Sequence, residues 1–128
     1  MKNKAALITG GGTGIGRATA LALAAQGCSV AVNYSRPAAA ADETAAEAKA
    51  LGVDAVAIQG DVASDEDCRR VATEAVDALG RLDVLINSAG TTVFVDHGDL
   101  EGTTPEDSQH LFAVNAMGPF HMLSLIDI

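Results

Sequence analysis

The stretch TGGGTGIG, residues 9–16, follows a short apolar run at residues 5–8 and is the strongest local signal in the chain. Five of its eight residues are glycine. Because glycine loses more backbone freedom on folding than any other residue, such a cluster needs a geometric reason. A flexible linker is one explanation, and a turn that closes backbone N–H groups on a phosphate is another.

Two common phosphate-binding patterns do not fit this turn. The dinucleotide fingerprint GxGxxG fails in every register. The phosphate-loop pattern GxxxxGK[ST] has the spacing of Gly11 to Gly16, but Arg17 and Ala18 stand where its lysine and hydroxyl belong. Both of these patterns are therefore set aside.

The pattern that fits is TGxxxGxG, formed by Thr9, Gly10, Gly14 and Gly16. Gly10 would supply the tight turn, and Gly14 would let the backbone approach a pyrophosphate. Gly16 would let the following helix pack close to the strand, so that the helix points its first N–H groups at the anion.

Short apolar runs alternate with longer helical patterns along the rest of the chain. The expected strands are 5–9, 29–33, 53–59 and 82–87, and the expected helices are 15–25, 38–51, 64–79 and 104–125. Residues 91–104 are expected to be irregular. This alternation predicts a single α/β domain over 1–128, a Rossmann-type, doubly wound parallel sheet in the order 3-2-1-4, with helices on both faces.

Charge and composition exclude several classes of partner. The chain has 17 acidic against 8 basic residues, and its net charge of -9 opposes binding to nucleic acid or to anionic membranes.

Cys28 and Cys68 lack any metal-ligand spacing, and His97, His110 and His121 are scattered, so no metal site is expected. Two cysteines without a disulfide framework favour a cytoplasmic protein. The apolar run after MKNK is too short for a signal peptide or membrane span.

Four motifs stand in order along residues 1–122: TGxxxGIG at 9–16, Gly-Asp-Val at 60–62, Asn-Ser-Ala-Gly at 87–90, and Asn115. In this combination the chain resembles the short-chain dehydrogenase/reductase family. The resemblance implies a nicotinamide dinucleotide site, and the candidate cofactor-binding residues are Gly10, Gly12, Thr13, Gly14, Ile15, Gly16, Asn33, Tyr34, Ser35, Arg36, Asp61, Val62, Asn87, Ser88, Ala89 and Gly90.

The resemblance also implies particular roles at the ends of the third and fourth strands. Asp61 would accept a hydrogen bond from the adenine amino group, and Val62 would border the ring; a plain turn carboxylate is the alternative for Asp61. The segment 87–90 would brace the central sheet, and Ala89 and Gly90 would be small so that the ribose can pass.

Asn115 is the candidate catalytic residue. It lies four residues before Pro119, which lacks the N–H that would bond the Asn115 carbonyl in a regular helix. In the family this carbonyl holds a water of a proton relay. The alternative is an asparagine that only caps a kink.

The region after the second strand favours NADP over NAD. NAD-selective sites place an acidic residue there for the ribose 2′-hydroxyl, but no acid precedes Asp42. Ser35 and Arg36 could instead bind a 2′-phosphate. Arg17 is a weaker phosphate candidate, and either arginine could simply be a solvated surface residue.

The family's catalytic serine and YxxxK pair are absent from this chain. Tyr34 is the only tyrosine, Ala38 follows it at the position of the lysine, and no lysine occurs after Lys49. We therefore expect a C-terminally truncated fold that is inactive alone. Its fourth strand would have an open edge, and its last helix would expose apolar residues and favour a homo-oligomer; these residues are Leu111, Phe112, Val114 and Met122.

Two functions remain open at this point. One is the cofactor-binding part of an NADP(H)-dependent oxidoreductase that exchanges hydride with a small-molecule carbonyl or alcohol substrate. The other is a non-catalytic dinucleotide-binding module or remnant. The sequence does not identify the substrate.

Overall fold

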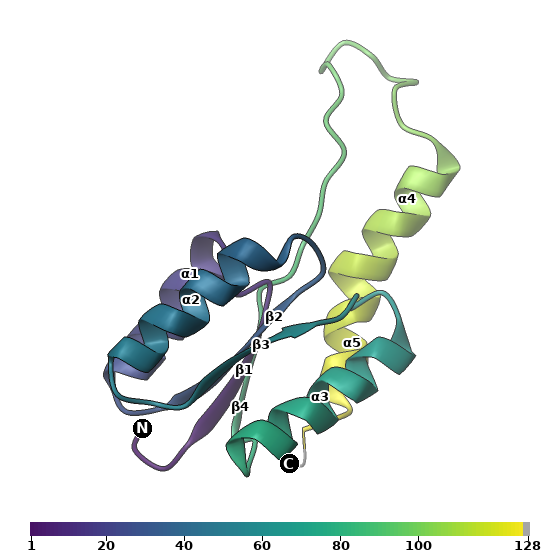
Figure 1. Cartoon of the computed structure of the whole chain (residues 1–128). Helices are drawn as coiled ribbons and strands as arrows, with labels where there is room; N and C mark the ends of the chain where they lie inside the picture. Colours follow the sequence, from purple (N-terminus) through teal and green to yellow (C-terminus); the bar gives the residue numbers. More distant parts are fainter. Residues whose placement is uncertain (127–128) are drawn as a thin grey trace.

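The computed structural model describes residues 1–126 and contains a four-stranded parallel sheet (Figure 1). Its order, β3-β2-β1-β4, confirms the predicted topology. The strands are β1 Ala5–Thr9, β2 Ser29–Tyr34, β3 Ala55–Gln59 and β4 Val84–Asn87. All pairings are parallel, so the carboxyl ends of the strands meet at one edge of the sheet.

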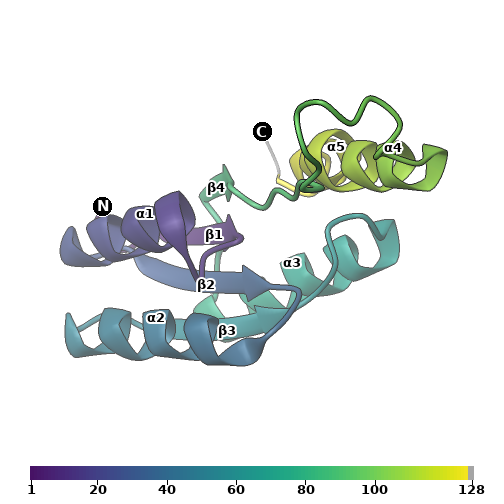
Figure 2. The same ribbon diagram turned by 90° about the horizontal axis from the view of Figure 1, so that it is seen from above.

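Helices cover both faces of this sheet. α1 and α2 lie on one face, whereas α3 and α5 lie side by side on the other (Figure 2). The helical segments are α1 Gly14–Ala25, α2 Ala38–Ala50, α3 Asp65–Leu79, α4 Pro105–Phe112, the π-helical η1 Ala113–Met117, and α5 Gly118–Leu123. Within residues 1–126, no helix is long and apolar enough to cross a lipid bilayer.

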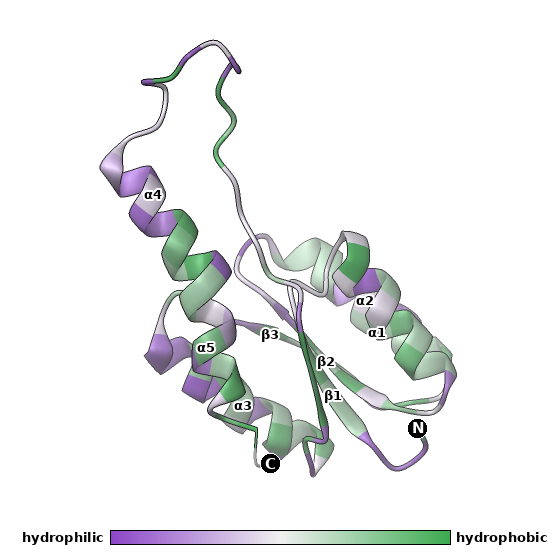
Figure 3. Ribbon diagram, turned by 180° about the vertical axis from the view of Figure 1, so that it is seen from behind, coloured by the Kyte–Doolittle hydropathy of each residue, from purple (hydrophilic) through white to green (hydrophobic). Residues whose placement is uncertain are grey.

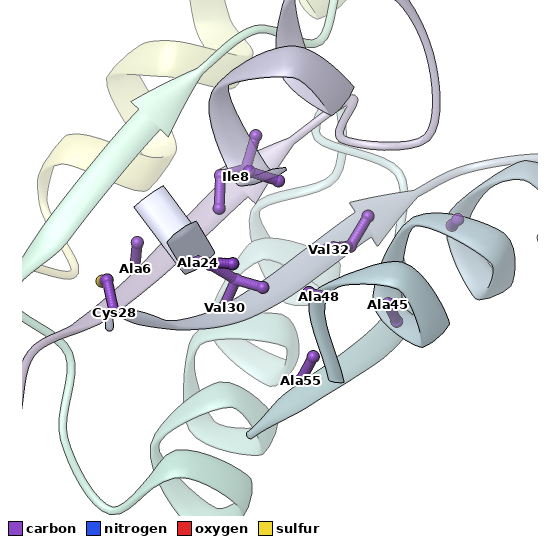
Figure 4. Close-up of a cluster of buried hydrophobic side chains, with 11 residues drawn as sticks. Ala6, Ile8, Ala24, Cys28, Val30, Val32, Ala45, Ala48 and Ala55 are labelled. Atoms are coloured by element: carbon purple, nitrogen blue, oxygen red, sulfur yellow. The ribbon is translucent and has the colours of Figure 1, made fainter. Parts of the chain in front are cut away.

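Each face of the sheet has its own apolar core because successive strand residues point to opposite sides. Ala6 and Ile8 of β1 pack under α1 and α2, which contribute alanines that allow close approach (Figure 4). Leu7 points to the other face and joins a cluster of residues from β2, β3 and the opposite helices, namely Ala31, Ile58, Val62, Cys68, Val71, Ala75, Val114 and Met122. Figure 3 shows hydrophobic residues along most of the strands.

Local capping signals in the sequence account for where two helices begin. The Ser64 side chain accepts a hydrogen bond from the Asp67 N–H at 3.1 Å, as its position before an acidic first turn predicts. Thr104 and Asp107 form a reciprocal capping box at the start of α4. At its other end, α3 ends at Gly80, which has a φ of 80°.

The prediction of a single helix over 104–125 is wrong in detail. After α4 the chain forms the π-helical segment η1, in which the Gly118 N–H bonds the Ala113 carbonyl five residues back. Pro119 follows at the start of α5 and has no N–H to continue the α-helical pattern. The helix therefore changes register around Asn115 instead of running through it.

The burial of this last segment also differs from the prediction. Val114 and Met122 are buried in the apolar cluster that includes Leu7 and Val71, so the expectation that they would be exposed is wrong. Phe112 is 61% exposed, as expected, and Leu111 is partly buried. The difference arises because α5 lies beside α3 and η1 contacts α5, whereas α4 and residues 91–104 project beyond the sheet (Figure 1).

Candidate functional site

A groove of about 750 Å³ lies at the edge of the sheet where the strands end. The turn after β1, the loops after β2 and β3, and the segment after β4 form its walls. All of the predicted cofactor-binding residues except Gly16 and Asn87 line it. In open α/β sheets, ligands bind in the crevice at this edge.

The glycine turn brings β1, α1 and the segment after β4 into close contact. Gly10 has a φ of 62°, and a Cβ on it would lie 2.8 Å from the Ala89 Cα. Gly16 lies outside the groove because it is packed under the turn, where a Cβ would lie 2.3 Å from the Gly10 carbonyl oxygen. Gly14 has a φ of 54° and open space where a Cβ would stand. The turn therefore needs glycine for two different physical reasons.

The first turn of α1 faces the groove through Thr13, Gly14 and Ile15. Thr13 is the N-cap residue, but its side chain makes no capping hydrogen bond in the described part of the chain. The first N–H groups of a helix have no partner within the helix and attract anions. This end of α1 is therefore suited to a phosphate group.

Thr9 has a role that sequence reasoning did not assign. Its buried Oγ1 accepts hydrogen bonds from the N–H groups of Ser88 and Ala89, both at 3.1 Å. It thereby joins the end of β1 to the turn after β4, so that both walls keep their spacing. The only sign of this role in the sequence is a threonine at the end of a predicted strand. That sign does not indicate that the hydroxyl bonds Ser88, 79 residues away.

Asn33 lines the groove, but its side chain is engaged within the protein. It is 1% exposed, and its Nδ2 donates to the carbonyls of Ile58 and Gly60, each at 3.2 Å. Its own carbonyl accepts from the Gly11 N–H at 3.1 Å. Asn33 therefore joins the ends of β2 and β3 to the glycine turn.

The two candidate phosphate-binding arginines lie in different surroundings. Ser35 and Arg36 are exposed at the groove, and no ion pair involves Arg36 within residues 1–126. Arg17 instead forms an ion pair with Glu47 of α2 and does not line the groove. Only Arg36 is therefore placed to meet a ligand there.

Asp61 lies at the groove immediately after β3 and also shapes its own turn. Its Oδ1 accepts from the Ala63 N–H at 2.9 Å, and its N–H donates to Asp67 Oδ2 at 2.9 Å. The residue is exposed, so a ligand can reach the carboxylate. This geometry fits both of the roles considered for Asp61.

Asn115 and Asn87 lie together beside the groove, in a second hollow that Pro119 and Phe94 also line. The Asn115 side chain clamps the backbone of Thr91: Oδ1 accepts from the Thr91 N–H at 2.8 Å, and Nδ2 donates to the Thr91 carbonyl at 2.9 Å. Sequence reasoning considered only the Asn115 backbone and missed this pair. The π-helical turn is the irregularity that accompanies Pro119.

Among residues 1–126, no group of three or more His, Cys, Asp or Glu side chains is placed to hold a metal ion. The groove is lined by glycines, other small residues and a few polar residues. Those are the features of a nucleotide groove.

Comparisons with known proteins agree with this geometry. The chain matches the short chain dehydrogenase family over residues 4–126. Versicolorin reductase 1 of Aspergillus parasiticus is 41% identical over 120 residues, which cover 94% of this chain and 45% of that protein. The short-chain dehydrogenase/reductase homolog YusS of Bacillus subtilis is 43% identical over 104 residues, which cover 81% of this chain and 95% of that protein.

A solved structure is also similar to this chain in fold and in sequence. A short chain dehydrogenase from Burkholderia cenocepacia, in complex with NADP, has a TM-score of 0.89 and 36% identity, covering 97% of this chain and 49% of that one. The chain thus spans about half the length of most of these relatives. Fold, groove and sequence similarity agree, and the chain belongs to the short-chain dehydrogenase/reductase family.

Proposed function

We propose that this chain is the cofactor-binding part of an NADP(H)-dependent oxidoreductase that interconverts an alcohol and a ketone. The observation that carries the proposal is the groove itself. The uncapped start of α1 and exposed Arg36 lie along one groove, where each could meet a phosphate of the same dinucleotide. The NADP complex of the Burkholderia cenocepacia relative supports the same class of ligand.

The choice of NADP rests on charge at the end of β2. The loop from Tyr34 to Pro37 has no carboxylate, and the first acid beyond it is Asp42 in α2. A carboxylate would repel a 2′-phosphate, whereas the Ser35 hydroxyl and the Arg36 guanidinium can bind one. The lack of a carboxylate and the presence of Arg36 in this loop would therefore favour NADP over NAD.

The residues present fit a nicotinamide dinucleotide. The space beside Gly14 is open, and Gly10 keeps the backbone of the turn free of side-chain atoms. In our proposal the α1 N–H groups bind the pyrophosphate, Asp61 accepts from the adenine amino group, and Ala89 and Gly90 border the ribose. The cofactor, when bound, supplies or accepts the hydride. Asn115 takes part in the proton relay through its backbone carbonyl.

Residues 1–128 contain neither the serine nor the YxxxK pair that the family uses to bind and protonate a carbonyl. A tyrosine general acid is needed to give a proton to the developing alkoxide. We therefore propose that these 128 residues bind cofactor but do not turn over substrate alone.

A non-catalytic binding module is the second candidate. One observation favours it: the Bacillus subtilis homolog YusS is matched over 95% of its own length by only 104 residues, so a short chain of this kind has a counterpart. The nucleotide sequence after codon 128 separates the two candidates. A continuing reading frame that encodes a serine and then YxxxK supports the enzyme, and its absence supports the module.

Titration of the purified chain with NADPH and NADH tests the cofactor. We expect NADPH to bind about ten- to a hundredfold more tightly, as one or two charge-assisted hydrogen bonds would provide. Arg36→Glu should remove this preference, and Arg36→Lys should keep part of it. Arg17→Gln is the matched control outside the groove. A clear preference of the unmodified chain for NADH would contradict the proposal.

We also propose self-association through exposed apolar side chains of the projecting loop and of α5. Phe94 is 94% exposed, Leu100 is 92% exposed, and Phe120 is 66% exposed. Exposed apolar side chains that gather into a patch are typical of surfaces that a second protein covers. Light scattering across protein concentrations measures this, and a constant monomer mass would exclude it.

A further inference from the structure

The loop between β3 and α3 contacts α5 at Val62. His121 Nδ1 lies 3.2 Å from the carbonyl oxygen of Val62, the residue that follows Asp61. Gly118, one turn earlier in α5, packs so closely that a Cβ there would lie 2.8 Å from Val62 Cγ2. Val62 lines the groove on one side and is 5% exposed. A groove wall therefore rests directly on α5.

The partner atom determines where the His121 hydrogen lies. A carbonyl oxygen can only accept, so a bare Nδ1 facing it would oppose two lone pairs. The arrangement therefore requires the hydrogen on Nδ1. The same carbonyl oxygen lies 3.4 Å from Cys68 Sγ of α3. Burial, with Asp65, Asp67 and Asp61 nearby, raises the pKa of the Cys68 thiol to about 11, so this group keeps its hydrogen at neutral pH.

The helical segment 113–121 thus contacts two walls of the site. Asn115 clamps the Thr91 backbone after β4, while Gly118 and His121 hold Val62 after β3. These contacts are unlike the general apolar packing of α5, because a hydrogen bond to one carbonyl oxygen sets the orientation of a peptide.

We propose that His121 is a positioning residue for the adenosine end of the dinucleotide site. Its Nδ1–H holds the Val62 carbonyl, and the N–H of the same peptide, that of Ala63, donates to Asp61 Oδ1. The bond therefore orients Val62 and, through this N–H, the Asp61 carboxylate toward the ligand. The inference rests on the proposed cofactor-binding function, which it deepens by naming the residue behind the adenine wall.

Three substitutions at one position separate the hydrogen bond from packing. Asparagine can place an amide N–H where Nδ1 stands, glutamine places it near Nε2, and phenylalanine keeps a ring without a donor. The probes are adenosine 2′,5′-bisphosphate, NADPH and reduced nicotinamide mononucleotide, titrated by calorimetry. His97→Phe, at an exposed position outside both hollows, is the matched control.

We expect His121→Asn to bind all probes like the unmodified chain. His121→Gln and His121→Phe should bind adenosine 2′,5′-bisphosphate and NADPH about tenfold more weakly, the effect of one hydrogen bond, without a change for the mononucleotide. Equal affinities for all three variants would overturn the inference. So would a lower melting temperature with unchanged ratios between the probes, because that result indicates only a structural role.

A measurement on the unmodified chain covers the case in which the variants do not fold. The ¹⁵N chemical shifts of the His121 ring report which nitrogen carries the hydrogen. A proton on Nδ1 supports the inference, and a ring with the hydrogen on Nε2 alone overturns it. If the folded chain bound none of the probes, the proposed cofactor function would fail, a result distinct from loss of binding in His121 variants alone.

Discussion

Residues 5–59, the amino-terminal half, and residues 84–126, the carboxyl-terminal segment, are stabilised in different ways. All five residues of β1 are buried between two layers of helices. By contrast, no residue of α4 is buried, and Phe94 and Leu100 are almost fully exposed. The amino-terminal half is therefore a packed core that includes the glycine turn. The carboxyl-terminal segment, which carries Asn115, contributes only Val114 and Met122 to the buried hydrophobic residues of the described chain.

Side-chain hydrogen bonds supplement this smaller contact at defined points. Besides apolar packing and the pairing of β4 with β1, the segment is attached by Thr9, which accepts from Ser88 and Ala89, and by His121, which bonds the Val62 carbonyl. Asp83, just before β4, accepts from the Ala5 N–H. The Asn115 pair with Thr91 lies within the segment and holds its own shape. Packing is spread over many atoms, whereas each of these links depends on one side chain. Substitutions in the two regions should therefore differ in how much stability they remove and in how far from the substituted residue their effects extend.

The largest effect is expected inside the amino-terminal half, at Gly16. Gly16→Val would place a Cβ against the Gly10 carbonyl oxygen, where backbone and not a flexible side chain must move. We expect a loss of about 3 kcal/mol or more in the free energy of unfolding, measured by urea denaturation. Gly98→Val in the projecting loop is the control, because nothing lies within 4 Å of a Cβ there. Similar losses for both variants would contradict the comparison.

The next largest effect is expected where the two regions meet, at Thr9. Thr9→Val keeps the shape but removes the oxygen that accepts from two N–H groups, so these partly buried donors lose their partner. The expected cost is about 2 kcal/mol in urea denaturation. Thr9→Ser retains the oxygen and should recover most of the stability. Equal losses for valine and serine would assign the effect to the methyl group instead.

Local patterns predicted the amino-terminal half well because its signals lie within a few residues of each other. Short apolar runs indicated β1 and β2, and, just beyond this half, Ser64 with its acidic neighbours indicated the start of α3. The parallel order then followed from the handedness of the crossovers. Strand ends were less accurate: β3 and β4 each begin two residues later than predicted, at Ala55 and Val84.

The site was predicted less completely because its polar contacts join distant parts of the chain. The partners of Asn33 lie 25 and 27 residues away, and the Thr91 partner of Asn115 lies 24 residues away. No periodicity or spacing encodes such pairs. Pro119 indicated that a backbone bond would be lost, but nothing in the neighbouring sequence indicated that a π-helical turn would form there or that the Asn115 side chain would bond Thr91.

A smaller and more local effect is expected at Asn115. Asn115→Leu removes both hydrogen bonds to Thr91, and because the pair is exposed, the cost in unfolding free energy should be about 1 kcal/mol. Amide hydrogen exchange at the Thr91 N–H should become about tenfold faster, while exchange in β1 follows only the small global change. Uniformly faster exchange throughout the sheet would show that Asn115 supports the core and not only its own segment.

The smallest effect is expected at Asp83, and it depends on pH. Two hydrogen bonds lower the pKa of the Asp83 carboxyl below its ordinary value of 3.8: the one from Arg81 has the larger effect, and the one from the Ala5 N–H has the smaller. A carboxyl whose pKa is lower in the folded state stabilises the fold above its ordinary pKa, and that contribution is lost as the pH falls through the folded value.

Asp83→Asn should therefore lower the urea midpoint slightly at pH 7 and lose this difference as the pH falls below the folded-state pKa of Asp83, because the wild-type carboxyl is then protonated and also neutral. The Ala5 N–H can still donate to the asparagine oxygen, so the change isolates charge from the backbone contact. Glu101→Asn, in the projecting loop, supplies the same loss of charge without a link to β1. If both substitutions gave the same pH dependence, general charge repulsion in this acidic chain would explain the effect, and Asp83 would not be a specific attachment of β4.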